Sequence, residues 1–422
     1  MDRKLYRVVF FGGWTVSFGV TESIFHHLYN NHFPKQMQLT KTILVIFLFS
    51  VLFYTSSCRH PKAKENTSSK QGDVEFAPGG LAENGMDSLL ILQMQDAIQK
   101  GIYPNIHSVL ILKNNKLVYE NYFAGKDEIW GDDLGVINHH KDSLHDIRSI
   151  SKSIVAACVG LSLQQGNIDS LTQSIFDFFP EYKKYDTGPR SKITVEMLLT
   201  MTSGMEWNEN VPYSDPRNSE IQMTSSADPI EFVLSRPIVT TPGVAWEYNG
   251  GTTQLLASIV ERTSGLSIDA YAKKYLFAPL DIHDFEWIHF PNLDVPAAAS
   301  GLRLKSRDLM KFGMLYANNG QYKGAQLLSK EWVEKSKQPH VWFGRNNNVG
   351  YGYQLWIFKA HTIMESQSHL IPAAVGNGGQ RIYIDDKNGL IIVITAGNYN
   401  DWTLKNDSEA LLIDFIYPAL AQ

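Results

Sequence analysis

The sequence predicts an α+β fold in which one antiparallel sheet, built from both chain ends and flanked by helices, holds an inserted, mostly helical region. Two hairpin patterns indicate the sheet. Residues 107–123 form two apolar runs around Asn114-Asn115, and residues 381–395 form two β-branched runs around an Asp-Lys-Asn-Gly turn. Helical patterns lie between the two hairpins, so the simplest packing joins both chain ends in one sheet. A cleft is expected where this sheet meets the helical region.

Apolar periodicity identifies the helices. In chain order they run from Ser149 to about Gly166, over 193–202, over 254–262, from Ser306, and from about Ser408 to the C-terminus. The first is almost wholly apolar, which predicts that it is buried. We expect Ser306 to cap the fourth helix. That helix carries one apolar stripe, made of Leu309, Phe312, Leu315 and Tyr316.

Composition sets broad limits on the class of protein. The 422 residues fit one large domain or two interleaved ones, and 44% hydrophobic with 19% charged residues indicates a globular chain with a sizeable core. The net charge of -5 is spread without long runs of one sign. Nothing in this pattern indicates nucleic-acid binding.

The N-terminal part contains an export signal pattern. Residues 43–54 are apolar but too few to span a bilayer, and Lys41 supplies a positive flank. Ser56 and Ser57 precede Cys58, which resembles a bacterial lipoprotein signal. The expectation is lipidation at Cys58, a membrane contact through that lipid anchor, and a periplasmic or outer-membrane location. An uncleaved membrane anchor or a plain secretory signal would share the apolar run.

The most informative pair in the chain is Ser149 and Lys152. On a helix this i, i+3 spacing places both side chains on one face, one turn apart. A serine hydroxyl becomes a good nucleophile when a nearby base takes its proton, and a lysine amine can be that base when burial lowers its pKa. The alternative is an ordinary lysine at a solvated helix end.

Two further segments could complete such a site. Tyr248 lies in a Pro- and Gly-rich loop, 241–251, and its hydroxyl could relay protons; it could also be a packed aromatic. Residues 376–379 hold three glycines just before a strand, where backbone could approach a ligand or simply form a tight turn.

Together these elements resemble the serine β-lactamase and penicillin-binding-protein superfamily, in its esterase-like and 6-aminohexanoate-dimer-hydrolase-like branch. The resemblance runs from about residue 86 to the C-terminus. Its landmarks here are HDIRSISKSI, ITVEMLLTMTSG, WEYNGGTTQLL, SGLRLKSRDLMKFG and GNGGQRIYI. By resemblance, Ser149 forms the acyl-enzyme, Lys152 is the general base and Tyr248 helps to protonate the leaving group.

The resemblance also implies an oxyanion site. Asn377-Gly378-Gly379 lines up with the family's Lys-Thr-Gly element on the strand that edges the cleft. The backbone N–H groups of Ser149 and Gln380 would then hold the oxyanion, a contribution of a few kcal/mol to the transition state.

Two positions depart from the family pattern. Gly250 replaces the asparagine of Tyr-x-Asn, which normally holds a substrate amide; Asn249 could partly replace it. Asn377 replaces the lysine of Lys-Thr-Gly, which pairs with a substrate carboxylate, a contact worth about 1.5–3 kcal/mol. Arg381 could restore a cation if it faces the cleft. Both changes argue against an efficient β-lactamase and favour less charged esters or amides.

The signal pattern, the polar segment after it and the extent of the resemblance predict the domain boundaries. Residues 1–36 are an extra or mis-assigned segment, because Met37 would start a signal peptide of normal length, 37–57. A polar tether covers 58–85. The serine hydrolase domain covers 86–422. Its sheet region is 86–148 and 300–422, and its helical region is 149–299.

Other polar residues receive smaller roles. Because no HExxH or similar spacing occurs, we assign no metal, and His145, after His139-His140, is expected to brace the loop. No GxSxG, Walker or dinucleotide motif is present, and we expect no cofactor. Ser151 and Ser153 are expected to pack or to face solvent. Trp207 and Tyr213 could line the cleft or belong to the core.

The interpretation of the sequence is an exported serine hydrolase that cleaves a small-molecule or peptide ester or amide through Ser149. One alternative is a penicillin-binding D-alanyl peptidase or β-lactamase. Another is a non-catalytic binding or sensing lipoprotein of the same fold. An intact set of Ser149, Lys152 and Tyr248 speaks against this last alternative, because a binding protein needs no such set.

Overall fold

The computed structural model describes residues 75–344, 347–360, 369–401 and 407–420, and the backbone of 5–9 and 15–19. The chain divides into two units, 1–72 and 73–422. In the first unit, β1 (Leu5–Val9) and β2 (Thr15–Gly19) form an antiparallel pair. The predicted signal segment, Cys58 and the tether up to residue 74 lie outside the described residues.

The folded part of the second unit begins earlier than the predicted boundary at residue 86. Strand β3 (Ala77–Pro78) pairs in parallel with β5. Arg307 and Lys311 each form an ion pair with Glu75, at 3.0 Å and 2.7 Å. Residues 75–85 therefore belong to the domain, because both backbone pairing and ion pairs attach them to it.

The described residues of this unit contain one large sheet of nine strands, in the order β13-β14-β15-β16-β17-β18-β4-β5-β3. The strands are β13 (Val341–Phe343), β14 (Val349–Tyr351), β15 (Trp356–Lys359), β16 (Leu370–Gly376), β17 (Gln380–Asp385), β18 (Leu390–Ala396), β4 (Ile106–Lys113) and β5 (Lys116–Tyr122), besides β3. All neighbours except β3 and β5 are antiparallel. Because β18 pairs with β4, the two chain ends meet in one sheet, and the predicted fold class is confirmed.

Both predicted hairpins are present. Asn114 and Asn115 take φ values of 51° and 62° between β4 and β5, as a two-residue turn of the I′ type requires. The second hairpin joins β17 to β18 through residues 386–389. Two smaller antiparallel pieces lead toward Ser149. They are the hairpin of β6 (Ala124–Ile129) with β7 (Asp132–Asn138), and β8 (Leu144–Asp146), which pairs with β10 (Leu302–Lys305).

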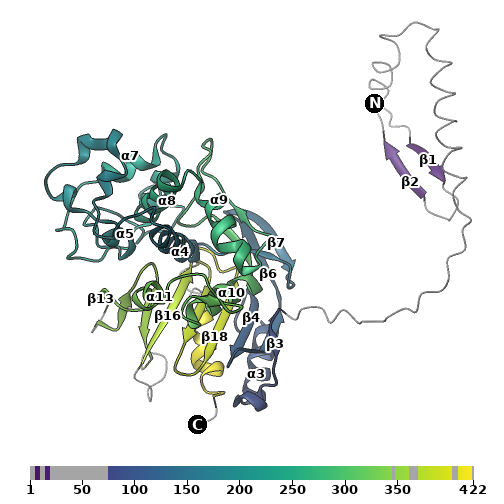
Figure 1. Cartoon of the computed structure of the whole chain (residues 1–422). Helices are drawn as coiled ribbons and strands as arrows, with labels where there is room; N and C mark the ends of the chain where they lie inside the picture. Colours follow the sequence, from purple (N-terminus) through teal and green to yellow (C-terminus); the bar gives the residue numbers. More distant parts are fainter. Residues whose placement is uncertain are drawn as a thin grey trace, which may run out of the picture. The chain divides into compact units, whose positions relative to one another are not determined.

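Helices cover both faces of the sheet (Figure 1). The described helices are α3 (Ser88–Gln99), α4 (Ile150–Gln164), α5 (Val195–Leu199), α6 (Ser219–Thr224), α7 (Pro229–Leu234), α8 (Gly250–Ser264), α9 (Ile268–Ala272), α10 (Ser306–Ala317), α11 (Lys330–Ser336) and α12 (Asp407–Leu411). Alternate residues of β4 point to opposite faces. Leu110 and Leu112 join the core with α4 and α10, whereas Val109 and Ile111 join the core with α3.

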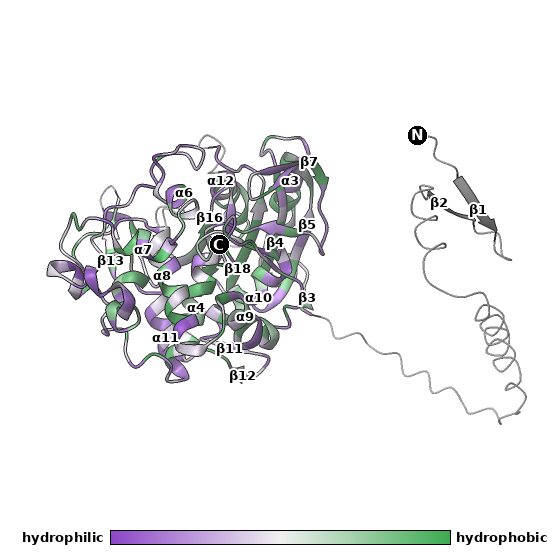
Figure 2. Ribbon diagram, turned by 90° about the horizontal axis from the view of Figure 1, so that it is seen from above, coloured by the Kyte–Doolittle hydropathy of each residue, from purple (hydrophilic) through white to green (hydrophobic). Residues whose placement is uncertain are grey.

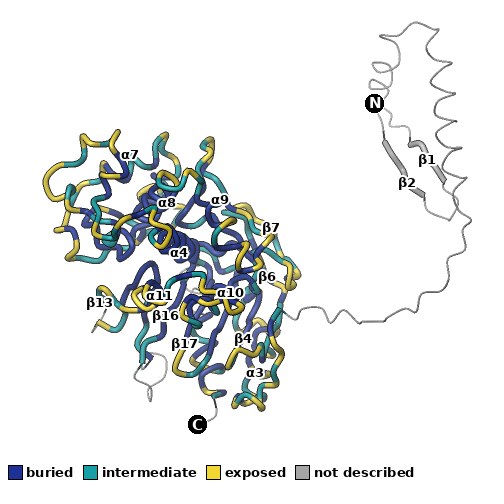
Figure 3. Tube along the Cα trace, viewed as in Figure 1, coloured by how far each residue is buried: buried dark blue, intermediate teal, exposed yellow. Residues whose placement is uncertain are grey.

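Helix α4 runs between the sheet and the inserted helical region, and it is buried along almost its whole length (Figure 3). Thirteen consecutive residues, 150–162, are buried. Hydrophobic residues concentrate on the interior elements, whereas the surrounding loops are more hydrophilic (Figure 2). The predicted all-round burial of this helix is confirmed, and it fixes the environment of Lys152.

Two helix ends differ from prediction. Ser306 does not cap α10; the N-cap is Lys305, and the Ser306 hydroxyl instead shares a 2.7 Å hydrogen bond with Ser108 on β4. The last helix is short. α12 is followed by a π-helical turn over Leu412–Ile416, and residues 417–420 are not helical. Among the described residues, no helix has the length and apolar character needed to cross a bilayer.

We predict that the Phe312 side chain on α10 is a main contributor to stability. It is buried within the core between α10 and the sheet. Phe312→Ala should lower the free energy of unfolding by about 3–5 kcal/mol, through lost burial and the cavity left behind. Leu92→Ala, on the exposed side of α3, should change it by less than about 0.5 kcal/mol. Urea unfolding measures both, and equal losses would contradict this view of the core.

Candidate active site

The Ser149 and Lys152 side chains meet at the start of α4. Lys152 Nζ lies 3.1 Å from Ser149 Oγ and donates a 3.0 Å hydrogen bond to the Ala299 carbonyl. Lys152 is only 1% exposed, and Ser149 is 9% exposed. The structure therefore brings the predicted amine and hydroxyl together in a nearly dry setting, and the solvated-helix-end alternative is wrong.

The backbone before Ser149 is held in an unusual conformation. Arg148 has a φ of 49°, in the left-handed region that non-glycine residues rarely adopt. Its guanidinium group forms ion pairs with Glu128 and, at 3.3 Å, with Asp146, and it lies 4.9 Å from the centre of the Tyr399 ring. These contacts offset the backbone strain and fix the turn that presents Ser149.

Tyr248 closes the group from the loop before α8. Its ring lies 5.0 Å from Lys152 Nζ. Burial, with the charges of Glu209 and Glu220 adding to it, raises the pKa of Tyr248 well above its ordinary value, and a hydrogen bond with Ser149 only partly opposes this shift. The phenol therefore stays protonated near neutral pH, which suits a proton donor better than a base.

Ser149 lies where two cavities meet. A cavity of about 480 Å³ has an aromatic wall that includes Trp246, Tyr248 and Trp356. A smaller one of about 140 Å³ lies toward Arg148 and Ser300. Trp246 stacks on Phe343 at 3.7 Å and meets Trp356 edge-on at 5.7 Å, so the wall of the larger cavity is rigid and apolar. This arrangement suits a small organic substrate with the reacting atom at Ser149.

The sequence analysis missed two buried carboxyl groups of the site, Glu209 and Glu220. Glu220 Oε2 is 3.8 Å from Lys152 Nζ, and Glu220 Oε1 accepts a 2.6 Å hydrogen bond from Ser300. Glu209 accepts hydrogen bonds from the Gly250 amide at 2.6 Å and from the Tyr213 hydroxyl at 2.8 Å. Burial raises the pKa of Glu209 to about 7; the charge of Glu220 adds to this, and that of Lys152 opposes it.

These carboxyl groups explain the glycine at position 250. A Cβ on Gly250 would lie 2.7 Å from Glu220 Oε2 and 3.1 Å from Glu209 Oε1, so the two acids fill the space that the family's asparagine would need. Asn249 does not replace that asparagine as a pocket residue. It is buried, its side-chain oxygen caps α8 by accepting from the Thr252 amide, and it lines neither of the two cavities.

The predicted oxyanion segment has a different local structure from the one expected. Residues 377–379 form the turn between β16 and β17, with Gly378 and Gly379 at φ values of 88° and 100°, and do not continue a strand. Asn377 and Gly378 line the larger cavity, whereas the Gly379 carbonyl accepts from Ser408 at 2.6 Å and Gly379 lines neither cavity.

Gln380 points away from substrate. Its side-chain amide pairs with the Ala396 backbone in both directions. Arg381 does line the larger cavity, but its Nη1 donates to the Gly376 and Gln380 carbonyls at 2.9 Å and 2.8 Å. The Arg381 guanidinium group therefore lies at the cavity wall, where part of it is hydrogen-bonded to backbone carbonyls.

The whole-chain comparison agrees with this arrangement. The family model described as Beta-lactamase matches residues 102–413. The chain belongs to the beta-lactamase family. That range includes Ser149, Lys152 and Tyr248, so the predicted recognition is confirmed.

Two curated relatives of this beta-lactamase family member are named as hydrolases. It is 28% identical over 239 residues to a 6-aminohexanoate-dimer hydrolase of Paenarthrobacter ureafaciens, covering 53% of this chain and 55% of that protein. It is 27% identical over 128 residues to a lovastatin esterase of Penicillium rubens, covering 28% and 30%. The chain thus spans about half the length of the first curated relative it matches, and less of the second.

Solved structures show the same fold. A putative 6-aminohexanoate-dimer hydrolase from Bacillus anthracis matches with a TM-score of 0.59 and 21% identity, over 76% of this chain and 82% of that chain. Simvastatin synthase from Aspergillus terreus matches with a TM-score of 0.60 and 17% identity, over 78% and 98%. At these identities the likeness concerns the fold of the family member and not its substrate.

Burial and contacts decide the roles of the other residues that the sequence analysis left open. Ser151 and Ser153 are both buried, and Ser153 donates to the Gln354 carbonyl at 2.6 Å, so they pack and do not face solvent. Trp207 belongs to the core, whereas Tyr213 lines both cavities. A sequence signal for the acids did exist: a glycine at the family's asparagine position leaves a space that another group must fill.

The Glu209 carboxyl group predicts a pH-dependent stability. Its pKa is about 7 in the folded chain against an ordinary 4.5. The folded state therefore binds more protons between these values, and the free energy of unfolding falls as the pH rises through this window. Glu209→Gln cannot ionise. The free energy of unfolding of this variant should therefore increase relative to that of the parent chain as the pH rises from about 5 to about 8, as measured by urea unfolding.

A control variant separates this effect from a general loss of charge. Glu231 is half-buried near the surface, and its hydrogen bond with Lys184 lowers its pKa. Its stabilising contribution is lost in the parent only as the pH falls below about 4.5, so the difference in unfolding free energy between Glu231→Gln and the parent should stay constant between about pH 5 and about pH 8. A Glu209→Gln difference that stays constant with pH would contradict the assignment.

Proposed function

We propose that this chain is a serine hydrolase that cleaves an ester or amide through an acyl-enzyme on Ser149. The observation that carries the proposal is the 3.1 Å separation between Ser149 Oγ and buried Lys152 Nζ, with Ser149 lining a cavity large enough for a small substrate. A nucleophile and a base within hydrogen-bonding distance form the minimal machinery for acyl transfer.

In the first half-reaction, Ser149 Oγ bonds to the substrate carbonyl carbon while its proton passes to Lys152 Nζ. A neutral amine can accept this proton with its lone pair while one N–H donates to the Ala299 carbonyl and another faces Glu220. Lys152 suits the role of base better than Tyr248, because the raised pKa of Tyr248 keeps its phenol protonated.

The leaving group then departs with a proton. The carbonyl reforms, the bond to the leaving oxygen or nitrogen breaks, and Tyr248 relays the proton from Lys152 to that atom. Water attacks the acyl-enzyme in the reverse sense and restores Ser149. The Ser149 and Gln380 backbone N–H groups are the proposed oxyanion donors. In support, Gly376 is the β16 residue that pairs with Gln380, and it packs so closely against the carbonyl of Ile147, two residues before Ser149, that a Cβ would lie 2.3 Å from that oxygen.

The cavity favours uncharged, apolar substrates. Glu209, Glu247 and Glu409 line it together with Arg381, so carboxyl groups outnumber cations. A substrate carboxylate would enter a region of like charge, whereas the aromatic wall of Trp246 and Trp356 gains from apolar contact. These features favour esters or amides of apolar acids over β-lactams and peptides that end in D-alanine.

We predict that Ser149→Ala abolishes labelling by a fluorophosphonate probe and lowers p-nitrophenyl ester turnover by at least about 10³-fold. Ser153→Ala, a buried serine one turn further along α4 that lines neither cavity, should keep both. Loss of labelling in both variants would indicate damage to α4. Unchanged turnover in Ser149→Ala would remove the proposal.

The charge of the cavity predicts a second selectivity. p-Nitrophenyl butyrate should be cleaved with a kcat/KM at least about tenfold above that of the matched p-nitrophenyl hemisuccinate, because the added carboxylate meets Glu209, Glu247 and Glu409. Fluorescent penicillin should label Ser149 poorly. Strong penicillin labelling with release of terminal D-alanine would instead establish the peptidase alternative.

Export remains a separate proposal that rests on sequence alone. We propose that the chain is cut before Cys58 and lipidated there, since small residues precede this cysteine and follow an apolar run. Metabolic palmitate labelling in a bacterial host should mark the chain, and Cys58→Ala should remove the label. A Cys58→Ala chain that keeps the label would reject this proposal.

A further inference from the structure

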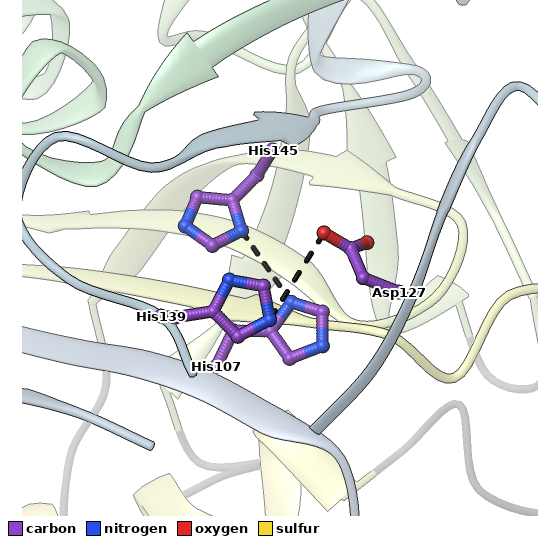
Figure 4. A group of neighbouring side chains, drawn as sticks. All are labelled: His107, Asp127, His139 and His145. Atoms are coloured by element: carbon purple, nitrogen blue, oxygen red, sulfur yellow. Dashed lines mark hydrogen bonds and ion pairs between the residues drawn. The ribbon is translucent and has the colours of Figure 1, made fainter. Parts of the chain in front are cut away.

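Four buried side chains converge on one point outside the site described above (Figure 4). They are His107 from β4, Asp127 from β6, His139 just after β7 and His145 from β8. One nitrogen or carboxylate oxygen from each lies within 4.8 Å of all the others. No short sequence motif predicts this group, because its members come from four separate segments.

Hydrogen bonds within the described residues leave much of the group unsatisfied. The side chain of His139 is 1% exposed, yet neither of its ring nitrogens has a partner, and His145 Nε2 also has none. Buried imidazole nitrogens without partners are costly. Three histidines packed this closely therefore need something that accepts their lone pairs.

The interatomic distances fit an ion between the ligands. His107 Nε2 donates to the Lys126 carbonyl at 2.8 Å, so its Nδ1 carries a lone pair that faces His145 Nδ1 at 3.4 Å. Two nitrogens bound to one tetrahedral zinc ion at about 2.0–2.1 Å lie about 3.3–3.4 Å apart. His139 Nε2 and Asp127 Oδ2 are 4.0 Å apart, beyond hydrogen-bonding distance but within reach of a shared ion.

Surrounding contacts orient the ligand atoms. Asp127 Oδ1 accepts from the Glu128 amide at 2.9 Å and from the Tyr399 hydroxyl at 3.2 Å, which leaves Oδ2 toward His139. The His107 ring is wedged so tightly that a Cβ on Gly397 would lie 2.6 Å from its Nε2. Such outer contacts commonly fix the tautomer and orientation of metal ligands.

Charge points the same way. His107, His139 and His145 lie beside the Asp127 carboxyl group, and all four side chains are buried. A divalent cation would offset this buried carboxylate.

We propose that His107, Asp127, His139 and His145 bind one divalent transition-metal ion, with Zn²⁺ as the preferred ion. Three imidazoles and one carboxylate suit zinc, whereas Mg²⁺ and Ca²⁺ prefer six or more oxygen ligands. Because all four ligands are protein side chains and buried, the site is structural. It joins β4, the β6–β7 hairpin and β8, and β8 ends three residues before Ser149. This proposal does not depend on the proposed hydrolase activity.

The full chain, stripped with dipicolinate, reloaded with zinc sulfate and passed through a desalting column, tests the site by elemental mass spectrometry. We expect about one zinc per chain, and at least about tenfold less in His139→Ala. His140→Ala changes the exposed neighbour and should keep the zinc. Less than about 0.1 zinc per parent chain, or equal zinc in His139→Ala, would overturn the proposal.

Two readouts on the parent chain do not depend on a foldable variant. Zinc should raise the Tm of the stripped chain, whereas Mg²⁺ or Ca²⁺ should not. Co²⁺ should give the strong visible absorption of tetrahedral coordination. A weak octahedral spectrum, or a Tm that responds to calcium and not to zinc, would contradict the ligand set.

Discussion

A lysine amine kept out of water beside a serine hydroxyl is the contact on which the rest of the site depends. Lys152 belongs to a helix whose residues 150–162 are all buried, so the amine cannot reach solvent and must find polar partners inside the domain. It finds the Ser149 hydroxyl, the Ala299 carbonyl and the Glu220 carboxylate. Every other feature of the site either supplies those partners or shapes the space above them.

The antiparallel sheet and its two hairpins could be predicted because the hairpin signals are local. Asn114-Asn115 can take positive φ values, and alternate apolar residues on β4 serve two cores, so turn chemistry and periodicity agree. The pairing of Ser149 with Lys152 could be predicted for the same reason, because an i, i+3 spacing on a helix needs no tertiary information. The failures have a common cause: Ser306 bonds across to Ser108 and Asn249 caps α8, and both choices are set by distant neighbours.

Position 250 shows how a departure from a family pattern becomes interpretable once volumes are known. Its glycine looked like a lost substrate contact. In the structure, Glu209 and Glu220 occupy that volume, and they come from a loop and a short helix whose positions relative to α8 no local pattern specifies. The carboxyl pair replaces the family's side-chain amide with two acids, of which Glu209 lines the larger cavity and Glu220 the smaller one. A site organised in this way holds its base firmly and offers little to a substrate amide, which is consistent with an apolar wall that selects by shape.

The four clustered side chains, His107, Asp127, His139 and His145, lie next to the residues that hold the turn before Ser149. Arg148 has a strained backbone conformation, and its side chain contacts Glu128, Asp146 and Tyr399. Asp127 precedes Glu128, His145 precedes Asp146, and Tyr399 donates to Asp127, so the partners of Arg148 are neighbours of the four clustered side chains. An ion that joined these strands would therefore hold the strained turn as a unit. Without it, buried imidazole nitrogens that lack hydrogen-bond partners and a buried carboxylate would remain among the strands that hold the turn before Ser149.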